Sequence, residues 1–419
     1  MNSRERLAAA LEHRAPDRVP IDFGATFVTG IHVSVVHRLR RRLLGQPEHR
    51  VKVIEPYQML GEIDDELRAA LGIDVVGALG RTSIFGTEGR DWKEFTTFDD
   101  VPCLVPGALN LTRAPDGGWH MHPEGDTTVA PSGHMPDGGY FFDAVIRQDP
   151  VDDDRLDPAD NTEEFGLFTA EDLAFYEAKK RWFTERADLG SILVIPGTAF
   201  GDIALVPAPW LKHPRGIRDV TEWYISTKTR RDYVRAVFER QCEIALQNLD
   251  TLIDLFGDTI QVGLVTGTDF GTQRGPFVAP ETYRDLYQPF HRRINDRIHA
   301  RSSWKTFIHS CGSVDQLIPD FIEAGFDVLN PVQCSAAGMD AARLKREFGR
   351  DIVFWGGGVD TQQTMAFGTA DQVYREVRER IEVFNVDGGF VFNAIHNIQG
   401  NTPIENVEAL FEAVRDSGN

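Results

Sequence analysis

The sequence predicts an α/β protein of the TIM-barrel class, a (β/α)8 barrel, and two observations predict it. First, eight short apolar, β-branched runs recur along the 419 residues, and second, a segment of helical period follows each run. Strands that alternate with helices pair in parallel, and eight such units can close into a barrel. A doubly wound open sheet is the alternative, because spacing alone does not prove closure. The eight runs are 19–26, 71–79, 191–200, 259–271, 303–312, 325–333, 351–360 and 388–397.

The helical period is clearest in the second half, where the sequence predicts helices over 313–324, 340–349, 370–384 and 403–416. The segment 81–165, between the second and third runs, differs because Gly, Pro and Asp pairs divide it into short alternating stretches. This predicts a small antiparallel β insertion after the second strand, within a single domain spanning 1–419. The insertion is either a lid over the barrel rim or a surface decoration. Two outer-ring helices are expected within 201–258.

Composition restricts the classes of partner. The net charge of −20 would repel a nucleic-acid backbone, and no Lys/Arg stripe offsets it. No apolar run reaches the roughly 18 to 20 residues that span a bilayer, and the N-terminal segment is an amphipathic, charged helix without a signal-peptide core. We therefore expect a cytoplasmic protein with no nucleic-acid or membrane partner. The four cysteines are too few for a disulfide framework; among them, Cys242 is expected in the core of a helix and Cys103 has no assigned role.

Candidate metal ligands gather at the ends of predicted strands. His309 and Cys311 end the fifth run two positions apart, so their side chains point to the same side. An imidazole and a thiolate at the mouth of a barrel form half of a zinc site, whereas a buried His and Cys in the core is the alternative. Cys334 follows the sixth run and His396 ends the eighth, so both are expected on the same rim. The sequence favours His309, Cys311 and His396 as ligands, with Cys334 either the remaining ligand or a free thiol nearby.

Other polar residues also end predicted strands, where side chains more often serve a site than the fold. Asp269, in TGTDFGTQRGP, is the strongest candidate for a general acid or base or for orienting a substrate. Its alternative role is a helix N-cap or a loop anchor. The other candidates for the catalytic site are Asp22, Asn330, Gln333 and Asn393.

Six motifs spread over nearly the whole chain carry a family resemblance: RERLAAALEHRAPDRVPIDFG, DFGTQRGPFVAPETYRDLYQP, IHSCGS, DVLNPVQCSAAGMDAARLKREFG, VFWGGGVDTQ and HNIQGNTPIENV. With them the sequence resembles the uroporphyrinogen decarboxylase superfamily, specifically its zinc-dependent, corrinoid-linked methyltransferase branch. Segment 81–165 looks like the insertion of the longer bacterial members. The resemblance implies a TIM-barrel enzyme.

The resemblance also implies a site and a reaction. Decarboxylases of the superfamily carry an arginine-rich RQAGR segment after the first strand, but here the chain reads DFGATFVTG. The methyltransferase branch carries His-x-Cys at the fifth strand, matched by His309 and Cys311, and a third ligand at the eighth strand. That third ligand is usually Cys, and His396 stands in its place. In this branch zinc binds a thiol acceptor or the heteroatom of a methylated donor.

The resemblance implies a second cofactor, a corrinoid (cobalamin). The chain has no corrinoid-binding D-x-H-x-x-G motif, so we expect the corrinoid to come from a partner protein or free in solution. The expected function is methyl transfer or demethylation between the corrinoid and a small methylated substrate or thiol. A uroporphyrinogen decarboxylase-like decarboxylase or lyase is the alternative, and a non-catalytic, zinc-stabilised binding protein is a third. The sequence leaves open the methyl donor and acceptor, the direction of transfer and the oligomeric state.

Overall fold

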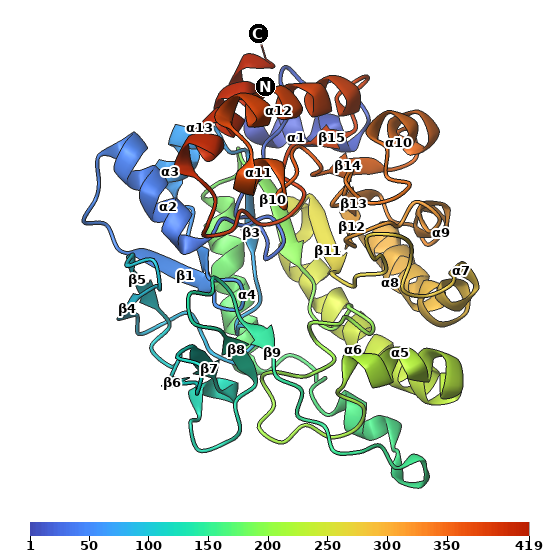
Figure 1. The fold of residues 1–419 in the computed structure, drawn as a ribbon. Helices are drawn as coiled ribbons and strands as arrows, with labels where there is room; N and C mark the ends of the chain where they lie inside the picture. The colour runs from blue at the N-terminus through green and yellow to red at the C-terminus, as the bar shows by residue number, and fades with distance from the viewer. Residues whose placement is uncertain (419) are drawn as a thin grey trace.

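The centre of the molecule is a curled sheet of seven parallel strands, seen in a computed structural model that describes residues 1–418 (Figure 1). Its strand order is β15-β14-β13-β12-β11-β10-β3, the sequence order of the predicted βα units. Seven of the eight predicted runs therefore form parallel strands, in a TIM-like arrangement. They are β3 (Val75–Ala78), β10 (Gly190–Val194), β11 (Val262–Thr266), β12 (Lys305–His309), β13 (Val328–Asn330), β14 (Val353–Trp355) and β15 (Phe390–Val391).

The remaining run, 19–26, joins the two edges of this sheet with a single bridging residue rather than a full strand. Phe392 donates its N–H to Pro20 O at 2.8 Å and accepts the N–H of Asp22 at 3.0 Å. On the other side, Asp74 N–H donates to Ile21 O at 2.8 Å. The extended stretch is short because Pro20 has no N–H to donate and Gly24 turns the chain with a φ of +90°. The two edges are thus linked around a TIM-like barrel, and not left apart as in an open sheet.

The interior of the sheet is filled by alternate strand residues, as the two-residue period of a strand requires. Helix α1 (Ser3–Leu11) supplies part of this cluster and packs at the beginning of β10, where a Cβ on Gly190 would lie 2.7 Å from Leu7 Cδ2. The amino ends of the strands are therefore closed, and the carboxyl ends are left for a site. The cluster comprises Leu7, Ala10, Leu11, Ala25, Val28, Val75, Ile192, Val262, Leu264, Phe307, Val328, Val353, Trp355 and Val391.

Helices lie around the outside of the sheet (Figure 1). The predicted helices of the second half appear as α9 (Ile318–Glu323), α10 (Ala341–Phe348), α12 (Ala370–Phe384) and α13 (Ile404–Asp416). α12 begins where Thr369 and Gln372 cap each other's backbone N–H groups. The other helices are α2 (Val33–Leu39), α3 (Asp65–Leu71), α4 (Ala170–Thr184), α5 (Val220–Thr229), α6 (Arg231–Phe256), α7 (Pro280–Thr282), α8 (Gln288–Arg301) and α11 (Thr364–Phe367).

Two smaller sheets lie beside the barrel, at the lower left of Figure 1. β6 (Leu111–Arg113), β7 (Trp119–Met121), β8 (Gly133–Met135) and β9 (Asp143–Ala144) form an antiparallel meander inside the segment 81–165. The other sheet pairs β4 (Lys93–Thr96) and β5 (Pro102–Val105) with β1 (Val51–Glu55) and β2 (Leu60–Gly61). β1 and β2 precede β3 and were not expected, and β1 runs parallel to β5, so this sheet is mixed.

The segment 201–258 contains the two expected helices, α5 and α6, after an irregular stretch over 201–219. Cys242 is fully buried on α6, as its helical position predicts, and Cys103 is buried in the core through β5. Within residues 1–418 none of the helices has the length and apolar character needed to cross a bilayer.

Candidate metal centre

Three of the four predicted metal-ligand residues meet at the carboxyl ends of the strands. His309 ends β12, Cys311 follows it by two residues, and His396 comes after β15. One ligand atom from each residue lies within 4.8 Å of the others, and His309 Nε2 is 3.3 Å from Cys311 Sγ. The two imidazole rings meet edge to face, with centroids 5.4 Å apart. The set has the nitrogen and sulfur donors that zinc prefers, with three protein ligands, as in catalytic sites.

Asn330, at the end of β13, fixes which nitrogen of His309 faces this group. Asn330 Nδ2 donates to Trp355 O at 2.8 Å, so its Oδ1 must be the atom 2.6 Å from His309 Nδ1. A carbonyl oxygen only accepts, and Nδ1 must therefore carry the ring proton. His309 Nε2 then has a free lone pair directed toward Cys311. Such a hydrogen bond from the far ring nitrogen is the usual support of a metal-binding histidine.

The ionisation of the three side chains follows from their burial. Burial lowers the pKa of His309 to about 4 and the pKa of His396 to about 4, so both rings are neutral near pH 7. Burial, followed by the neighbouring Asp269 carboxyl, raises the pKa of the Cys311 thiol well above its usual range. Neutral imidazoles are the ligand form of histidine, and a buried thiol ionises when a cation binds it. The residues present therefore fit a zinc ion.

Two further predicted residues hold the loop that carries Cys311. Asp269, just past β11, accepts the Cys311 N–H at 2.7 Å with the oxygen that lies 3.8 Å from His309 Nε2. Gln333 accepts the Gly312 N–H at 2.8 Å. Gly312 has a φ of +86°, and a Cβ there would lie 2.5 Å from Gly271 C, so both loops need glycine to approach this closely. Burial raises the pKa of Asp269.

The other predicted residues lie apart from this group. Burial raises the pKa of the Cys334 thiol to about 11. The charged side chains that also act on this pKa are Arg380, Glu376 and Asp340. Among the described residues, the group of potential ligands does not include Cys334.

Asp22 and Asn393 are fully buried in the barrel wall. Asp22 accepts hydrogen bonds from Trp355 Nε1 at 3.0 Å and Ala25 N–H at 3.2 Å, and burial raises its pKa to about 7. Asn393 Nδ2 donates to Asp22 O at 2.6 Å. Neither residue lines the cavity described next. Their hydrogen bonds instead connect the first predicted strand, 19–26, to β14 and to the segment after β15.

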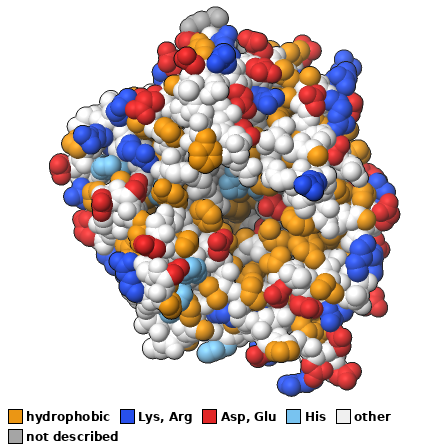
Figure 2. Space-filling model, in the orientation of Figure 1, with side chains coloured by type: hydrophobic (Ala, Val, Ile, Leu, Met, Phe, Trp, Pro, Cys, Tyr) orange, Lys and Arg blue, Asp and Glu red, His pale blue; other side chains and the backbone are white. Residues whose placement is uncertain are grey.

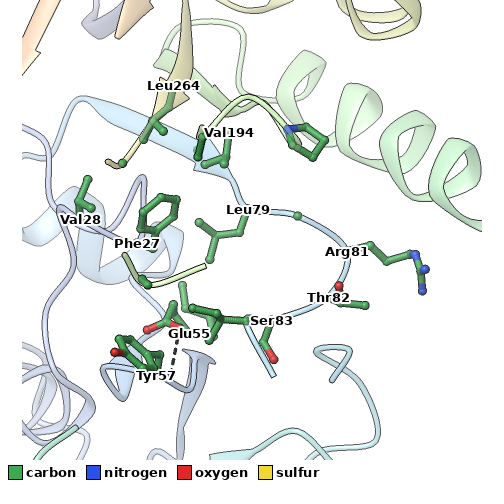
Figure 3. A pocket seen from close by; sticks show the side chains of 18 of the residues that line it. Phe27, Val28, Glu55, Tyr57, Leu79, Arg81, Thr82, Ser83, Val194 and Leu264 are labelled. Atoms are coloured by element: carbon green, nitrogen blue, oxygen red, sulfur yellow. Dashed lines mark hydrogen bonds between the residues drawn. The ribbon is translucent and has the colours of Figure 1, made fainter. Parts of the chain in front are cut away.

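A cavity of about 1200 Å³ opens beside the metal-ligand group. His309, His396 and Asp269 line it, together with apolar side chains that include Phe27, Val194 and Leu264 (Figure 3). Figure 2 shows the corresponding face hollowed near its centre, with hydrophobic side chains around the hollow. A largely apolar cavity with a few polar groups is typical of a small-molecule site.

The cavity also contains carboxyl groups that the sequence analysis missed. Asp202 lies two residues past the third predicted run, and Glu55 ends β1. Burial raises the pKa of each to about 7. The rule that polar residues at barrel strand ends serve the site would have found Asp202. Glu55 gave no such signal, because β1 lies outside the barrel pattern.

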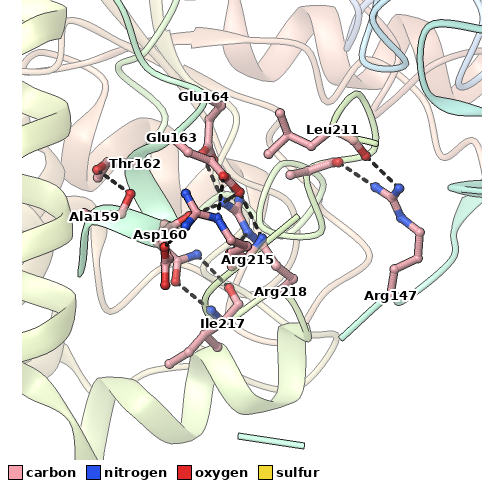
Figure 4. Close-up of polar contacts among 12 residues, drawn as sticks. Arg147, Ala159, Asp160, Thr162, Glu163, Glu164, Leu211, Arg215, Ile217 and Arg218 are labelled. Atoms are coloured by element: carbon pink, nitrogen blue, oxygen red, sulfur yellow. Dashed lines mark hydrogen bonds and ion pairs between the residues drawn. The ribbon is translucent and has the colours of Figure 1, made fainter. Parts of the chain in front are cut away.

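Two arginines, Arg218 and Arg147, hold together two irregular stretches near the cavity (Figure 4). Arg218, which is 1% exposed, pairs with Glu164 at 2.8 Å, and Arg147 donates to Leu211 O at 2.6 Å and Ala208 O at 2.8 Å. These bonds join the stretch around residues 147–164 to the stretch around 208–218. Glu164 and neighbours of the second stretch line the cavity. The two irregular stretches are thus fixed against each other at the cavity wall.

Comparisons with known proteins agree with this fold. No curated protein matches the sequence. The fold is similar to that of a solved structure, a methyltransferase from Methanosarcina mazei, with a TM-score of 0.54, 14% sequence identity and 99% of each chain covered. At this identity the likeness concerns the fold alone. The family model described as uroporphyrinogen decarboxylase (URO-D) matches residues 204–417, slightly more than half of the chain. The chain therefore belongs to the uroporphyrinogen decarboxylase family.

Proposed function

We propose that this protein is a zinc-dependent methyltransferase or demethylase that moves a methyl group between a corrinoid and a small methylated molecule or thiol. The observation that carries the proposal is the convergence of His309, Cys311 and His396 within 4.8 Å beside a cavity. Three ligands leave a coordination position open for a substrate atom. Family membership and the fold shared with a methyltransferase support the same reading.

In this proposal zinc, when bound, supplies a Lewis acid that stabilises a thiolate or withdraws electron density from a heteroatom bearing a methyl group. The chain's own residues arrange the rest. Asn330 keeps the Nδ1 proton of His309 in place, and Gln333 and Asp269 hold the backbone beside Cys311. Asp269 also faces the cavity, where its carboxyl can hold an N–H or O–H group of the substrate. The corrinoid is a second substrate, delivered free or by a partner protein.

The alternative is a decarboxylase acting on a polycarboxylate such as uroporphyrinogen, and the charges of the cavity disfavour it. Within residues 1–418, Glu55, Asp202 and Asp269 form no ion pair with a Lys or Arg side chain. Four cationic side chains that line the cavity are already paired with other carboxylates: Lys52, Arg68, Arg81 and Arg186. Substrate carboxylates placed among the three unpaired carboxyl groups would be buried without cationic partners, which is strongly unfavourable. A methylated small molecule needs only an apolar cavity and one Lewis acid.

The test monitors both reactions side by side on the purified full-length protein. Co(I) cobalamin is mixed with a panel of methyl ethers, methyl thioethers and methylamines, and methylcobalamin is mixed with small thiols, while the cobalamin absorbance is recorded. We expect a spectral change with at least one partner that disappears after chelation and returns with added zinc. Carbon dioxide released from uroporphyrinogen at an enzymatic rate, unaffected by chelation, would overturn the proposal.

A further inference from the structure

Asp202 has an unused carboxylate oxygen at the wall of the cavity. Only 6% of the residue is exposed, and it lines the cavity. Its Oδ1 accepts the Ala204 N–H at 2.9 Å, whereas its Oδ2 accepts no hydrogen bond in the described part of the chain. No Lys or Arg among these residues forms an ion pair with it. A buried carboxyl group without a partner is costly to ionise, so a compensating positive charge beside it stabilises its ionised form.

The space next to this oxygen is bounded by an aromatic ring. A Cβ placed on Gly267, just past β11, would lie 3.2 Å from Asp202 Oδ2 and 3.3 Å from Phe27 Cε2. Gly267 and Phe27 both line the cavity as well. In this corner of the cavity the Asp202 carboxylate and the Phe27 ring therefore both approach Gly267, and a Cβ at that position would be in tight contact with both. A carboxylate beside an aromatic ring is an arrangement that binds organic cations.

Within residues 1–418, the cationic side chains that line the cavity make their contacts elsewhere. Arg81 lines the cavity, but it pairs with Asp172 at 2.7 Å and Glu88 at 2.5 Å, and Figure 3 shows its side chain directed away from the cavity. Lys52 pairs with Glu62 at 3.4 Å. Arg68 and Arg186 both pair with Asp65. Lys179 lies over the rings of Phe175 and Trp182.

Asp202 is also connected to the metal-ligand group. Asp202 and Asp269 both line the cavity, and the charge of Asp269 adds to the larger effect of burial in raising the pKa of Asp202. Asp269 itself lies 3.8 Å from His309 Nε2. Asp202, Asp269, His309 and His396 thus line one and the same cavity, so a small molecule bound at Asp202 shares that cavity with the metal-ligand group.

From this geometry we propose that the cavity binds a small molecule with a positively charged ammonium group, held between the Asp202 carboxylate and the Phe27 ring. The proposal deepens the proposed function by naming the charge class of the small substrate, and it rests on that function only for the methyl transfer itself. The substrate's other end lies toward His309 and His396.

The experiment measures equilibrium binding by calorimetry, with no cobalamin present, on the full-length protein. The two ligands are choline and its neutral isostere 3,3-dimethylbutan-1-ol, in which carbon replaces the quaternary nitrogen. We expect choline to bind about ten-fold or more tightly than the isostere, as a desolvated ionic contact gives. Asp202→Asn, of nearly the same shape, should remove this preference.

Two more variants make the result specific. Gly267→Ala places a methyl group in the corner and should weaken choline about ten-fold while leaving Asp202 intact; it also serves if Asp202→Asn fails to fold. Asp143→Asn removes the same charge from an exposed position that lines the cavity, and it should leave choline binding unchanged. Equal binding of both ligands, no binding of choline, or unchanged binding in Asp202→Asn would overturn the inference. None of these results depends on zinc-linked methyl transfer, so the two proposals fail separately.

Discussion

Replacing Asn330 by Ala tests whether the metal-ligand group is built to bind an ion. The change removes the acceptor 2.6 Å from His309 Nδ1 and the donor 2.8 Å from Trp355 O. Nothing then fixes the tautomer that leaves Nε2 free. Loss of such a support typically lowers metal affinity about 10- to 100-fold, which corresponds to about 1.4–2.7 kcal/mol. Two buried polar groups also lose their partner, and each costs about 1–3 kcal/mol of folding stability.

Asn393→Ala is the matched control, because Asn393 is an equally buried asparagine whose side chain donates to Asp22 O and makes no hydrogen bond to a proposed ligand. Zinc affinity is measured by competition with a chromophoric chelator, and stability by urea unfolding of the metal-free proteins. We expect both variants to lose stability and only Asn330→Ala to lose zinc affinity. Equal zinc affinity in Asn330→Ala and the unmodified protein would refute the reasoning.

Three further predictions concern the cavity, its wall and the fourth candidate ligand. Burial raises the pKa of Asp202 from 3.8 to about 7, so ionisation of this group destabilises the ligand-free fold progressively from about pH 4 to pH 7. The Asp202→Asn variant should therefore be more stable than the unmodified protein by on the order of 2–4 kcal/mol above pH 7, and equally stable below pH 4, as measured by urea unfolding across pH. Arg218→Met leaves Glu164 buried without its partner and should cost about 3–5 kcal/mol in the same assay; a loss below about 1 kcal/mol would contradict the role given to this pair. His396→Ala should lower zinc affinity more than Cys334→Ala in chelator competition, and the reverse order would place Cys334 in the site.

The barrel could be predicted from sequence because its strands carry their own signal. Buried parallel strands are short apolar runs, and helices of regular period follow them. β1 and β2 were missed because their pairing is long-range: Val51 pairs with Cys103, and Lys52 with Leu104. The pairing partners lie about as far apart in sequence as two barrel strands, and no local pattern indicates them.

Sequence could predict the grouping of candidate ligands only where the direction of a strand determines which side a side chain faces. His309 ends β12 and Cys311 follows two residues later, so continuing the alternation of the strand predicts that their side chains share one side, and His309 Nε2 lies 3.3 Å from Cys311 Sγ. Cys334 also follows a strand, but its N–H donates to Val332 O, and its charged neighbours belong to α12 (Glu376 and Arg380) and to the start of α10 (Asp340). Once the chain has left a strand, loop geometry decides where a side chain points. Asp202 follows a strand as well, and its role depends on Phe27, which lies far away in sequence.

X-ray absorption at the zinc edge of the zinc-loaded protein tests the central claim most directly, because it counts the donor atoms around the ion. With His309, Cys311 and His396 as ligands, the account predicts a single sulfur at about 2.3 Å and two imidazole nitrogens at about 2.0–2.1 Å, with a further light atom from solvent or substrate. The Cys311→Ala variant should lose the sulfur signal together with most of its zinc. A spectrum with two sulfurs, or with none, or full zinc occupancy in Cys311→Ala, would contradict the account.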